Sequence, residues 1–182
     1  MKNKKILINI TNFMLFAILI AVDQITKILS VQHLKNQEPI DIIDGVLQLT
    51  YVANPGAMWG IMPGKQLFFI IITSIMLLAI IFMYIITPIQ KKYNPLKLIL
   101  VVLGAGAVGN LIDRIMNGYV HDFIYFKIID FPVFNVADIC VTLSMLCLIL
   151  LIIFKFKDND FNYIKDFFKK NKDNKESVEN VQ

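Results

Sequence analysis

Four apolar runs without a single charged residue dominate this chain of 182 residues. They are Ile6–Val22, Leu67–Thr87, Leu98–Ile112 and Ile139–Phe154, with 17, 21, 15 and 16 residues. A helix crosses a bilayer with about 20 apolar residues, so the second run spans unaided and the others need their flanking charges. Hydrophobic residues make up 57% of the chain, and a soluble fold would have nowhere to bury that excess. We therefore predict an all-α membrane protein with four spans.

Lysine and arginine counts predict how these helices are oriented. Of the 18 basic residues, 13 lie in Met1–Lys5, in the link between the second and third runs, and in the tail after Phe154. These three regions would share one side of the membrane. Because basic loops stay in the cytoplasm, we expect both termini to be cytoplasmic. The net charge of +4 reflects this asymmetry and does not indicate a nucleic-acid partner.

This topology divides the chain into a membrane domain, residues 1–155, and a basic cytoplasmic tail, residues 156–182. The tail is expected to be amphipathic at first and disordered from Asn171 onward. Two segments would face outward, at about residues 28–66 and 117–137. In the first of them, near-alternation in Gly45–Asn54 predicts a strand, and the Pro and Gly residues that follow predict turns.

Small residues and cysteines in the spans are assigned packing roles. The third run contains Gly104, Ala105, Gly106, Ala107 and Gly109, which would let another helix backbone approach closely. Cys140 and Cys147 are seven residues apart on one helical face. No Cys or His cluster has metal-ligand spacing, so we expect neither a metal nor another cofactor.

Four carboxylates converge on the predicted outer boundary, carried by Asp23, Asp113, Asp122 and Asp138. A carboxylate at the bilayer centre costs ~2.5–3.5 kcal/mol, and less near the interface. Asp23 has Lys27 one helical turn away, and Asp113 lies beside Arg114. Structural pairing or orientation of a substrate therefore accounts for these two aspartates.

Asp122 and Asp138 have no such local cation. Asp138 can cap the fourth helix, but capping does not account for Asp122. Two carboxylates brought together cannot both ionise easily, so one of them keeps a proton near neutral pH. One member can then take a proton from water while the other donates to a carbonyl oxygen. This is aspartic peptidase chemistry, and it needs no metal, cofactor or nucleophilic side chain.

Three other interpretations remain open from the residues alone. His121 suggests a Ser-His-Asp arrangement, but the outward segments hold only Ser30, and in an extended stretch His121 would point away from Asp122. A proton- or ion-coupled transporter could use membrane aspartates as a relay, although no acid lies inside any of the four runs. A scaffold without catalytic activity would leave the aspartates dispensable.

Five short motifs, in order along the chain, resemble lipoprotein signal peptidase, the signal peptidase II family. The resemblance covers nearly all of residues 6–155. The motifs are Asp23–Lys27, Asn54–Ala57, Gly109–Arg114, Val120–Phe123 and Phe134–Asp138. Each motif alone is weak, whereas all five on a four-span chain of this length are specific.

The resemblance implies a four-transmembrane-helix bundle with a small extracytoplasmic β-cradle. It implies a bacterial cytoplasmic-membrane enzyme, expected to be monomeric, that is active on the extracytoplasmic side. Its substrates would be prolipoproteins in contact with membrane lipid, cut just before a diacylglyceryl-modified cysteine. The implied catalytic residues are Asp122 and Asp138. The implied lining and supporting residues are Asn54, Gly56, Asn110, Arg114, Asn135 and Asp23.

The chain departs from the family pattern at three places. His121 stands where a small apolar residue is common, and Ile139 stands where serine is common. Met58-Trp59 replaces a smaller residue followed by an aromatic one. These positions bear on loop packing and substrate preference and leave the two aspartates in place.

Overall fold

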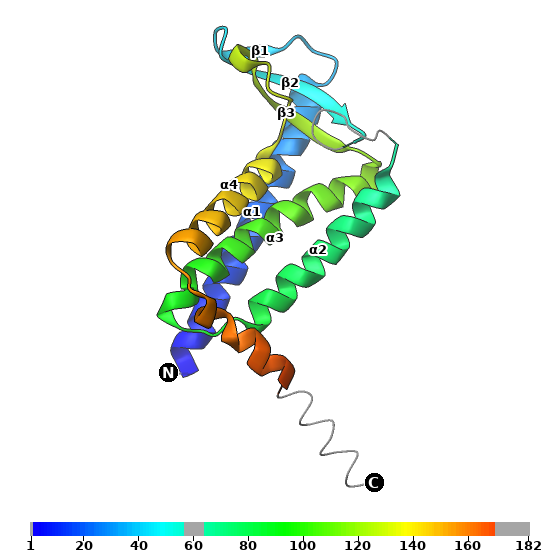
Figure 1. Cartoon of the computed structure of the whole chain (residues 1–182). Coiled ribbons are helices and arrows are strands. Elements are labelled where there is room, and N and C mark those ends of the chain that lie inside the picture. Colours follow the sequence, from blue (N-terminus) through cyan, green and yellow to red (C-terminus); the bar gives the residue numbers. More distant parts are fainter. Residues whose placement is uncertain (1, 57–63, 170–182) are drawn as a thin grey trace.

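The computed structural model describes residues 2–56 and 64–169. Met58, Trp59, Ala57 and the end of the tail therefore lie outside the described residues. Figure 1 shows a bundle of long helices below a small sheet. The helices are α1 (Lys2–Leu34), α2 (Gln66–Ile86), α3 (Asn94–Asn117) and α4 (Val136–Phe154). The strands are β1 (Ile40–Ile43), β2 (Leu47–Asn54) and β3 (Val120–Phe126), and the 3₁₀ turns are η2 (Lys91–Tyr93), η3 (Lys127–Ile129) and η4 (Asp158–Phe161).

All four helices are long and apolar enough to cross a membrane, as the sequence predicts. Helix α3 lies at the centre of the bundle and packs against α1, α2 and α4. Half of its most apolar stretch is buried inside the protein, against 17% for α4, 6% for α1 and 0% for α2. The other three helices therefore turn most of their apolar surface outward, where a bilayer would cover it.

Helix α1 is longer than its apolar run, so the predicted outward segment beginning near residue 28 starts inside a helix. The helix continues past Asp23 to Leu34. Lys27 and Ser30 are buried in this extension, and both have polar partners there. Lys27 is ion-paired, and the Ser30 hydroxyl donates to the Lys27 carbonyl at 2.8 Å. The apolar run marks only the part of α1 that lacks charge.

The ends of α3 follow from its sequence. Pro95 lies in the first turn, where proline costs no hydrogen bond. Gly118 follows Asn117 with φ 76°, a left-handed conformation that ends the helix. This tight stop leads directly into β3.

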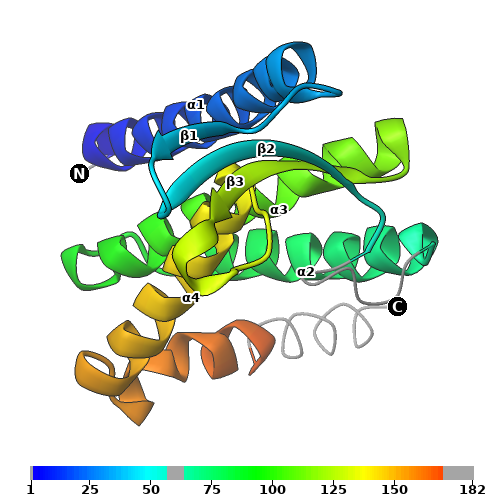
Figure 2. The same ribbon diagram turned by 90° about the horizontal axis from the view of Figure 1, so that it is seen from above.

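The three strands form an antiparallel sheet in the order β1-β2-β3. Strand β2 confirms the strand predicted within residues 45–54. The sheet covers one end of the helix bundle, which we call the sheet end (Figures 1 and 2). The register pairs Val52 with Asp122 and Ala53 with His121. The end of β2 therefore lies alongside the start of β3, close to the ends of α3 and α4.

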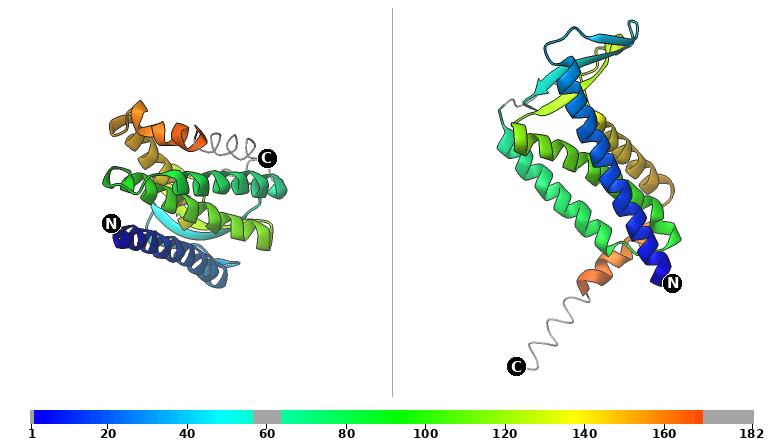
Figure 3. Two further views of the ribbon diagram at one scale, coloured as in Figure 1. Left: turned by 90° about the horizontal axis from the view of Figure 1, so that it is seen from below. Right: turned by 180° about the vertical axis from the view of Figure 1, so that it is seen from behind.

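The opposite end of the bundle, which we call the far end, holds the first turns of α1 and the described end of the chain (Figure 3). An apolar core there contains Tyr93, Leu96, Leu100 and Phe156. Phe161 and Tyr163 of the predicted tail pack against that core, and Phe167 contacts Phe82 of α2. The described part of the tail thus folds back onto the helices.

Candidate active site

Asp122 lies on β3 and points inward, with 2% of its surface exposed. Its Oδ2 accepts a hydrogen bond from Asn54 Nδ2 at 2.9 Å. Its Oδ1 accepts one from Asn135 Nδ2 at 2.6 Å. Neutral amides from β2 and from the start of α4 therefore hold the carboxylate in place.

Asp138 lies in the first turn of α4 and forms a capping box with Asn135. The Asn135 side chain accepts from the Asp138 backbone N–H at 3.0 Å, and Asp138 Oδ2 accepts from the Asn135 N–H at 3.1 Å. The predicted capping role of Asp138 is thus confirmed. Its Oδ1 accepts from Asn110 Nδ2 at 2.8 Å, so α3 also positions this carboxylate.

Asp122 and Asp138, the aspartate pair, line one pocket of about 50 Å³. Residues brought together from β2, α3 and α4 complete it. They include four of the sequence-predicted lining residues, Asn54, Gly56, Asn110 and Arg114. The fifth, Asn135, is fully buried behind the pair and donates to Asp122. A volume of this size has room for water and not for a peptide, which would have to approach from outside.

The aspartate pair is prepared to share a proton. Burial, followed by the nearby Asp138 carboxylate, raises the pKa of Asp122 to about 7. The hydrogen bonds from Asn54 and Asn135 act in the opposite direction and only partly offset this rise. A pKa near 7 allows Asp122 to hold a proton at neutral pH, which is the condition that the sequence argument sets for one member of the pair.

Arg114 borders the pocket and bridges α3 to the end of β2. Its guanidinium approaches the Gly56 and Asn110 carbonyl oxygens at 3.5 and 3.4 Å and lies 5.3 Å from the centre of the Phe69 ring. The buried Nε atom has no hydrogen-bond partner among the described residues. Gly56 is fixed in turn, because its N–H donates to Asn54 Oδ1 at 3.0 Å. Arg114 can therefore offer an N–H group to a bound ligand.

Asp23 lies outside the pocket and anchors the start of α4. Its Oδ1 accepts from the Ala137 N–H at 2.8 Å, and its Oδ2 pairs with Lys27 at 2.8 Å. The predicted pairing with Lys27 is thus confirmed. Asp113 also pairs with Lys27, at 3.1 Å, and accepts from the His121 backbone N–H at 3.1 Å. Both aspartates have structural partners on several elements.

Lys27 is the residue whose importance the sequence reasoning missed. Only 1% of its surface is exposed, and its Nζ also donates to Asn110 Oδ1 at 2.9 Å. Asn110 in turn donates to Asp138 and accepts from Asn135 at 3.1 Å. One chain of contacts therefore joins Lys27 to the aspartate pair. One feature of the sequence could have indicated this role of Lys27. Asn110 and Asp113 are three residues apart, so both of these partners of Lys27 lie on the same face of α3.

Two glycines of α3 allow this close assembly. A Cβ atom at Gly109 would lie 2.4 Å from Asp23 Oδ2, and one at Gly106 would lie 2.6 Å from the Ala137 carbonyl oxygen. Both distances are too short for any side chain. The predicted close approach of another helix to this stretch is confirmed: α4 approaches at Gly106, and both α1 and α4 approach at Gly109.

Comparison with known proteins identifies the family of this chain. The sequence profile described as "Signal peptidase (SPase) II" matches residues 15–154. The lipoprotein signal peptidase of Brevibacillus brevis is 40% identical over 147 residues, 81% of this chain and 97% of that protein. That of Enterococcus faecalis is 36% identical over 141 residues, 78% of this chain and 86% of that protein. The chain belongs to the signal peptidase II family.

Solved structures agree with that assignment. A bacterial membrane enzyme at 2.3 Å resolution is 35% identical, with a TM-score of 0.71, over 79% of this chain and 87% of its own. A second bacterial membrane enzyme structure, at 1.9 Å resolution, has a TM-score of 0.70. The match covers 80% of this chain and 94% of the chain in that structure. Signal peptidase II is an aspartic protease, so the transporter interpretation is not supported.

His121, a departure from the signal peptidase II pattern, faces away from the aspartate pair. Its Nδ1 is 2.9 Å from the Tyr51 hydroxyl, and its Nε2 is 3.3 Å from Asn117 Nδ2. Burial lowers the pKa of His121. The hydroxyl of Ser30 is occupied by the Lys27 carbonyl. The described residues therefore hold no Ser-His-Asp arrangement around Asp122.

The remaining departure, Ile139, is partly exposed on α4, directly after Asp138 and outside the pocket. Within residues 2–56 and 64–169, no group of three His, Cys, Asp or Glu side chains could hold a metal ion.

Proposed function

We propose that Asp122 and Asp138 are the catalytic residues of a membrane-embedded aspartic endopeptidase. The enzyme removes signal peptides from bacterial prolipoproteins by cutting before a cysteine that carries diacylglycerol. The observation that supports this most strongly is that both carboxylates line one water-sized pocket and are both held by Asn135. Relatives in Brevibacillus brevis and Enterococcus faecalis carry the name lipoprotein signal peptidase.

The reaction begins with one proton on the pair. Asp122, whose pKa is about 7, keeps that proton. Asp138 is the ionised member, because the first turn of α4 favours negative charge. A water in the pocket attacks the scissile carbonyl carbon while Asp138 takes its proton and Asp122 donates to the carbonyl oxygen. The tetrahedral diol then collapses as Asp138 passes its proton to the leaving nitrogen and Asp122 recovers one from the diol.

Polar groups around the pocket position the peptide. The Nε–H of Arg114, which has no partner within residues 2–56 and 64–169, is suited to a substrate carbonyl, and the guanidinium is held in place by Gly56 and the Phe69 ring. Asn54 links the turn after β2 to Asp122. This arrangement holds the scissile bond close to the water, which converts a bimolecular step into one within the complex.

The test is cleavage of a diacylglyceryl-modified prolipoprotein by the purified wild type and by two variants, Asp122→Asn and Asp138→Asn. Each substitution keeps the shape of the side chain and removes its acid–base function, so each should abolish cleavage. Asp41→Asn is the matched control, because Asp41 lies on β1 and bonds to Gln48 away from the pocket. Near-normal activity of either Asp122→Asn or Asp138→Asn would refute the assignment, provided that Asp41→Asn is also active.

We further propose that the enzyme is a monomer of the bacterial cytoplasmic membrane with both termini in the cytoplasm. Residues 1–155 would form the membrane domain and residues 156–182 the cytoplasmic tail, with the sheet end outside. The basic residues of the far end support this orientation. Single cysteines at Ile128 and Asn162, introduced after replacing Cys140 and Cys147 by alanine, test it. A membrane-impermeant maleimide should label Ile128→Cys in intact cells and label Asn162→Cys only after lysis. The reverse pattern would refute the orientation.

A further inference from the structure

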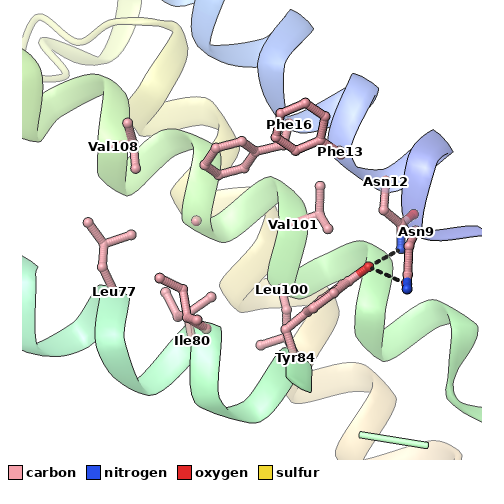
Figure 4. A pocket seen from close by; sticks show the side chains of 12 residues that line it. Asn9, Asn12, Phe13, Phe16, Leu77, Ile80, Tyr84, Leu100, Val101 and Val108 are labelled. Atoms are coloured by element: carbon pink, nitrogen blue, oxygen red, sulfur yellow. Dashed lines mark hydrogen bonds between the residues drawn. The ribbon is translucent and has the colours of Figure 1, made fainter. Parts of the chain in front are cut away.

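A second cavity, of about 500 Å³, lies between α1, α2 and α3 (Figure 4). Its walls are apolar along most of their length and include Phe13, Phe16, Leu77, Val101 and Val108. The α3 residues that line it, at positions 100, 101, 104 and 108, are on the helix face opposite Gly106, Asn110 and Asp113. The cavity is therefore separate from the pocket of the aspartate pair.

One end of the cavity is polar, in contrast to its walls. The Tyr84 hydroxyl accepts a hydrogen bond from Asn12 Nδ2 at 3.0 Å and donates one to Asn9 Oδ1 at 3.2 Å. These three side chains, which join α1 to α2, form the polar clasp. Each asparagine uses one amide atom here, and the other amide atom has no hydrogen-bond partner among the described residues. The clasp can therefore donate to, and accept from, a further polar group.

The position of the clasp matches the depth of lipid ester groups. Asn9 and Asn12 are four and seven residues after Lys5, about 6 and 10 Å along α1. Tyr84 is two residues before the end of α2. The clasp thus lies one to two turns inside the last charges of the far end, and the apolar part of the cavity runs from it toward the bilayer centre.

The dimensions of the cavity accommodate hydrocarbon chains. On each helix the lining residues span about seven positions, or roughly 10 Å. The cavity holds about 500 Å³ over that length, and its walls are mostly apolar. Flexible acyl chains can therefore fill the space.

Charge at the far end favours an anionic headgroup. Lys91 is exposed in η2, directly after the connection from α2. The neighbouring Lys92 is also exposed, but its Nζ is paired with Asp160. Juxtamembrane lysines attract anionic lipids by about 1 kcal/mol each. A lipid whose chains rise between α1 and α2 would place its headgroup near Lys91.

We propose that this cavity binds a glycerophospholipid from the leaflet that holds the N-terminal end of α1. The acyl chains lie between Phe16, Leu77 and Val108, the ester groups meet the polar clasp, and an anionic headgroup lies near Lys91. Under the orientation proposed above, this is the cytoplasmic leaflet. The lipid joins α1 to α2 on the face of α3 that faces away from the catalytic pocket. The proposal is independent of the catalytic assignment.

Photo-crosslinking tests the site in the full chain, reconstituted in nanodiscs of phosphatidylethanolamine and phosphatidylglycerol. Two phosphatidylglycerol probes are used, one with a diazirine near the carboxyl end of an acyl chain and one with it near the methyl end. Crosslinked residues are mapped by mass spectrometry. The first probe should label the surroundings of Asn12 and Tyr84, and the second those of Phe16 and Val108.

The matched variants are Gly104→Leu and Ala79→Leu, which place the same leucine side chain inside and outside the cavity. A Cβ at Gly104 would lie 3.5 Å from Ile80 and Phe16 side-chain atoms, so the added leucine grows into the cavity, whereas Ala79 is exposed on α2. Displacing about two methylene groups weakens binding roughly tenfold. Crosslinking inside the cavity should fall by that factor in Gly104→Leu and stay unchanged in Ala79→Leu. Leu77→Trp fills the cavity from α2 if Gly104→Leu does not fold.

Each alternative occupant gives its own result. Equal crosslinking in the wild type and in the filled variants would mean only general lipid contact and would overturn the proposal. Labelling in the reverse order, with the methyl-end probe at Tyr84, would mean a chain entering from the sheet end, such as the acyl chain of a substrate, and would also overturn it. Peptidase activity measured on the same samples keeps this outcome separate from any failure of the catalytic assignment.

Discussion

Replacing Lys27 by methionine tests whether one buried cation holds the sheet end together. Lys27 is 1% exposed, and its Nζ lies 2.8 Å from Asp23 and 3.1 Å from Asp113, which are themselves 1% and 2% exposed. Methionine keeps the length of the side chain and removes its charge. Both carboxylates then remain buried without a counter-ion. Removing one partner of a buried pair costs about 3–5 kcal/mol, so the free energy of unfolding should fall by that amount.

A double-mutant cycle with Asp113→Asn isolates the electrostatic part of this loss. In the Lys27→Met background, Asp113→Asn removes a repulsive charge and should be far less damaging than in the wild type. The coupling between the two sites should therefore approach the upper part of the 0.5–3 kcal/mol range found for contacting residues. Unfolding in detergent, followed by tryptophan fluorescence or circular dichroism at fixed lipid content, measures all four proteins.

Lys35→Met is the control, because Lys35 is exposed just beyond the end of α1. Surface substitutions of this kind usually change stability by no more than about 0.5 kcal/mol. The argument fails if Lys27→Met costs no more than Lys35→Met, or if the coupling with Asp113 is zero. In folded Lys27→Met, kcat should fall and KM should change little, since Asn110 then orients Asp138 less firmly.

Four further predictions concern the pocket and the residues packed around it. The pKa of Asp122 is raised from 3.8 to about 7, so kcat/KM should fall as the pH rises through about 7, and a rate that stays flat to pH 9 contradicts this. With this pKa, the folded state binds a proton on Asp122 more tightly than the unfolded state does. The contribution of Asp122 to the free energy of unfolding therefore falls as the pH rises from about 4 to 7. Asp122→Asn should remove this pH dependence, as measured by unfolding at several pH values. Gly109→Ala should lower the free energy of unfolding by about 1–3 kcal/mol and abolish most of the activity, because its Cβ would lie 2.4 Å from Asp23. Gly104→Ala is the control: its Cβ would have contacts of 3.5 Å, so thermal unfolding should be nearly unchanged. Asn54→Ala should lower kcat by roughly 2–10-fold, since Asp122 is the protonated member of the pair and a hydrogen bond between neutral groups contributes about 0.5–1.5 kcal/mol. Gln48 lies on the same strand as Asn54 and its amide bonds to Asp41 on β1, so Gln48→Ala should keep full activity in the cleavage assay.

Much of the fold could be predicted because the deciding signals are local. Four charge-free runs give four helices, and the alternation in residues 45–54 gives β2. The pairing of Asp23 with Lys27 needs only one helical turn, and the cap at Asp138 needs only three residues. The resemblance to the signal peptidase II family added the set of residues that would surround the pair, and the structure brings them together.

What the sequence did not disclose depends on contacts between distant elements. The extension of α1 to Leu34 is maintained by burial of Lys27 against α3, across more than 80 positions. The ring of Phe69 lies against Arg114 from a different span. The cavity between α1 and α2 exists because both helices pack on α3, and no periodicity in either helix reveals the space between them.

The choice of partners around the aspartate pair follows from its need to keep a proton. A cation in direct contact would favour ionisation of both carboxylates and remove the acid. Asp122 and Asp138 instead accept side-chain hydrogen bonds from neutral amides, and the nearest buried lysine is neutralised by two other aspartates. Lys27 can thus fix Asn110 without taking the proton from the pair. We therefore expect Asp23 and Asp113 to be needed for the proposed chemistry although neither lines the pocket, because they offset the charge of the lysine that fixes Asn110.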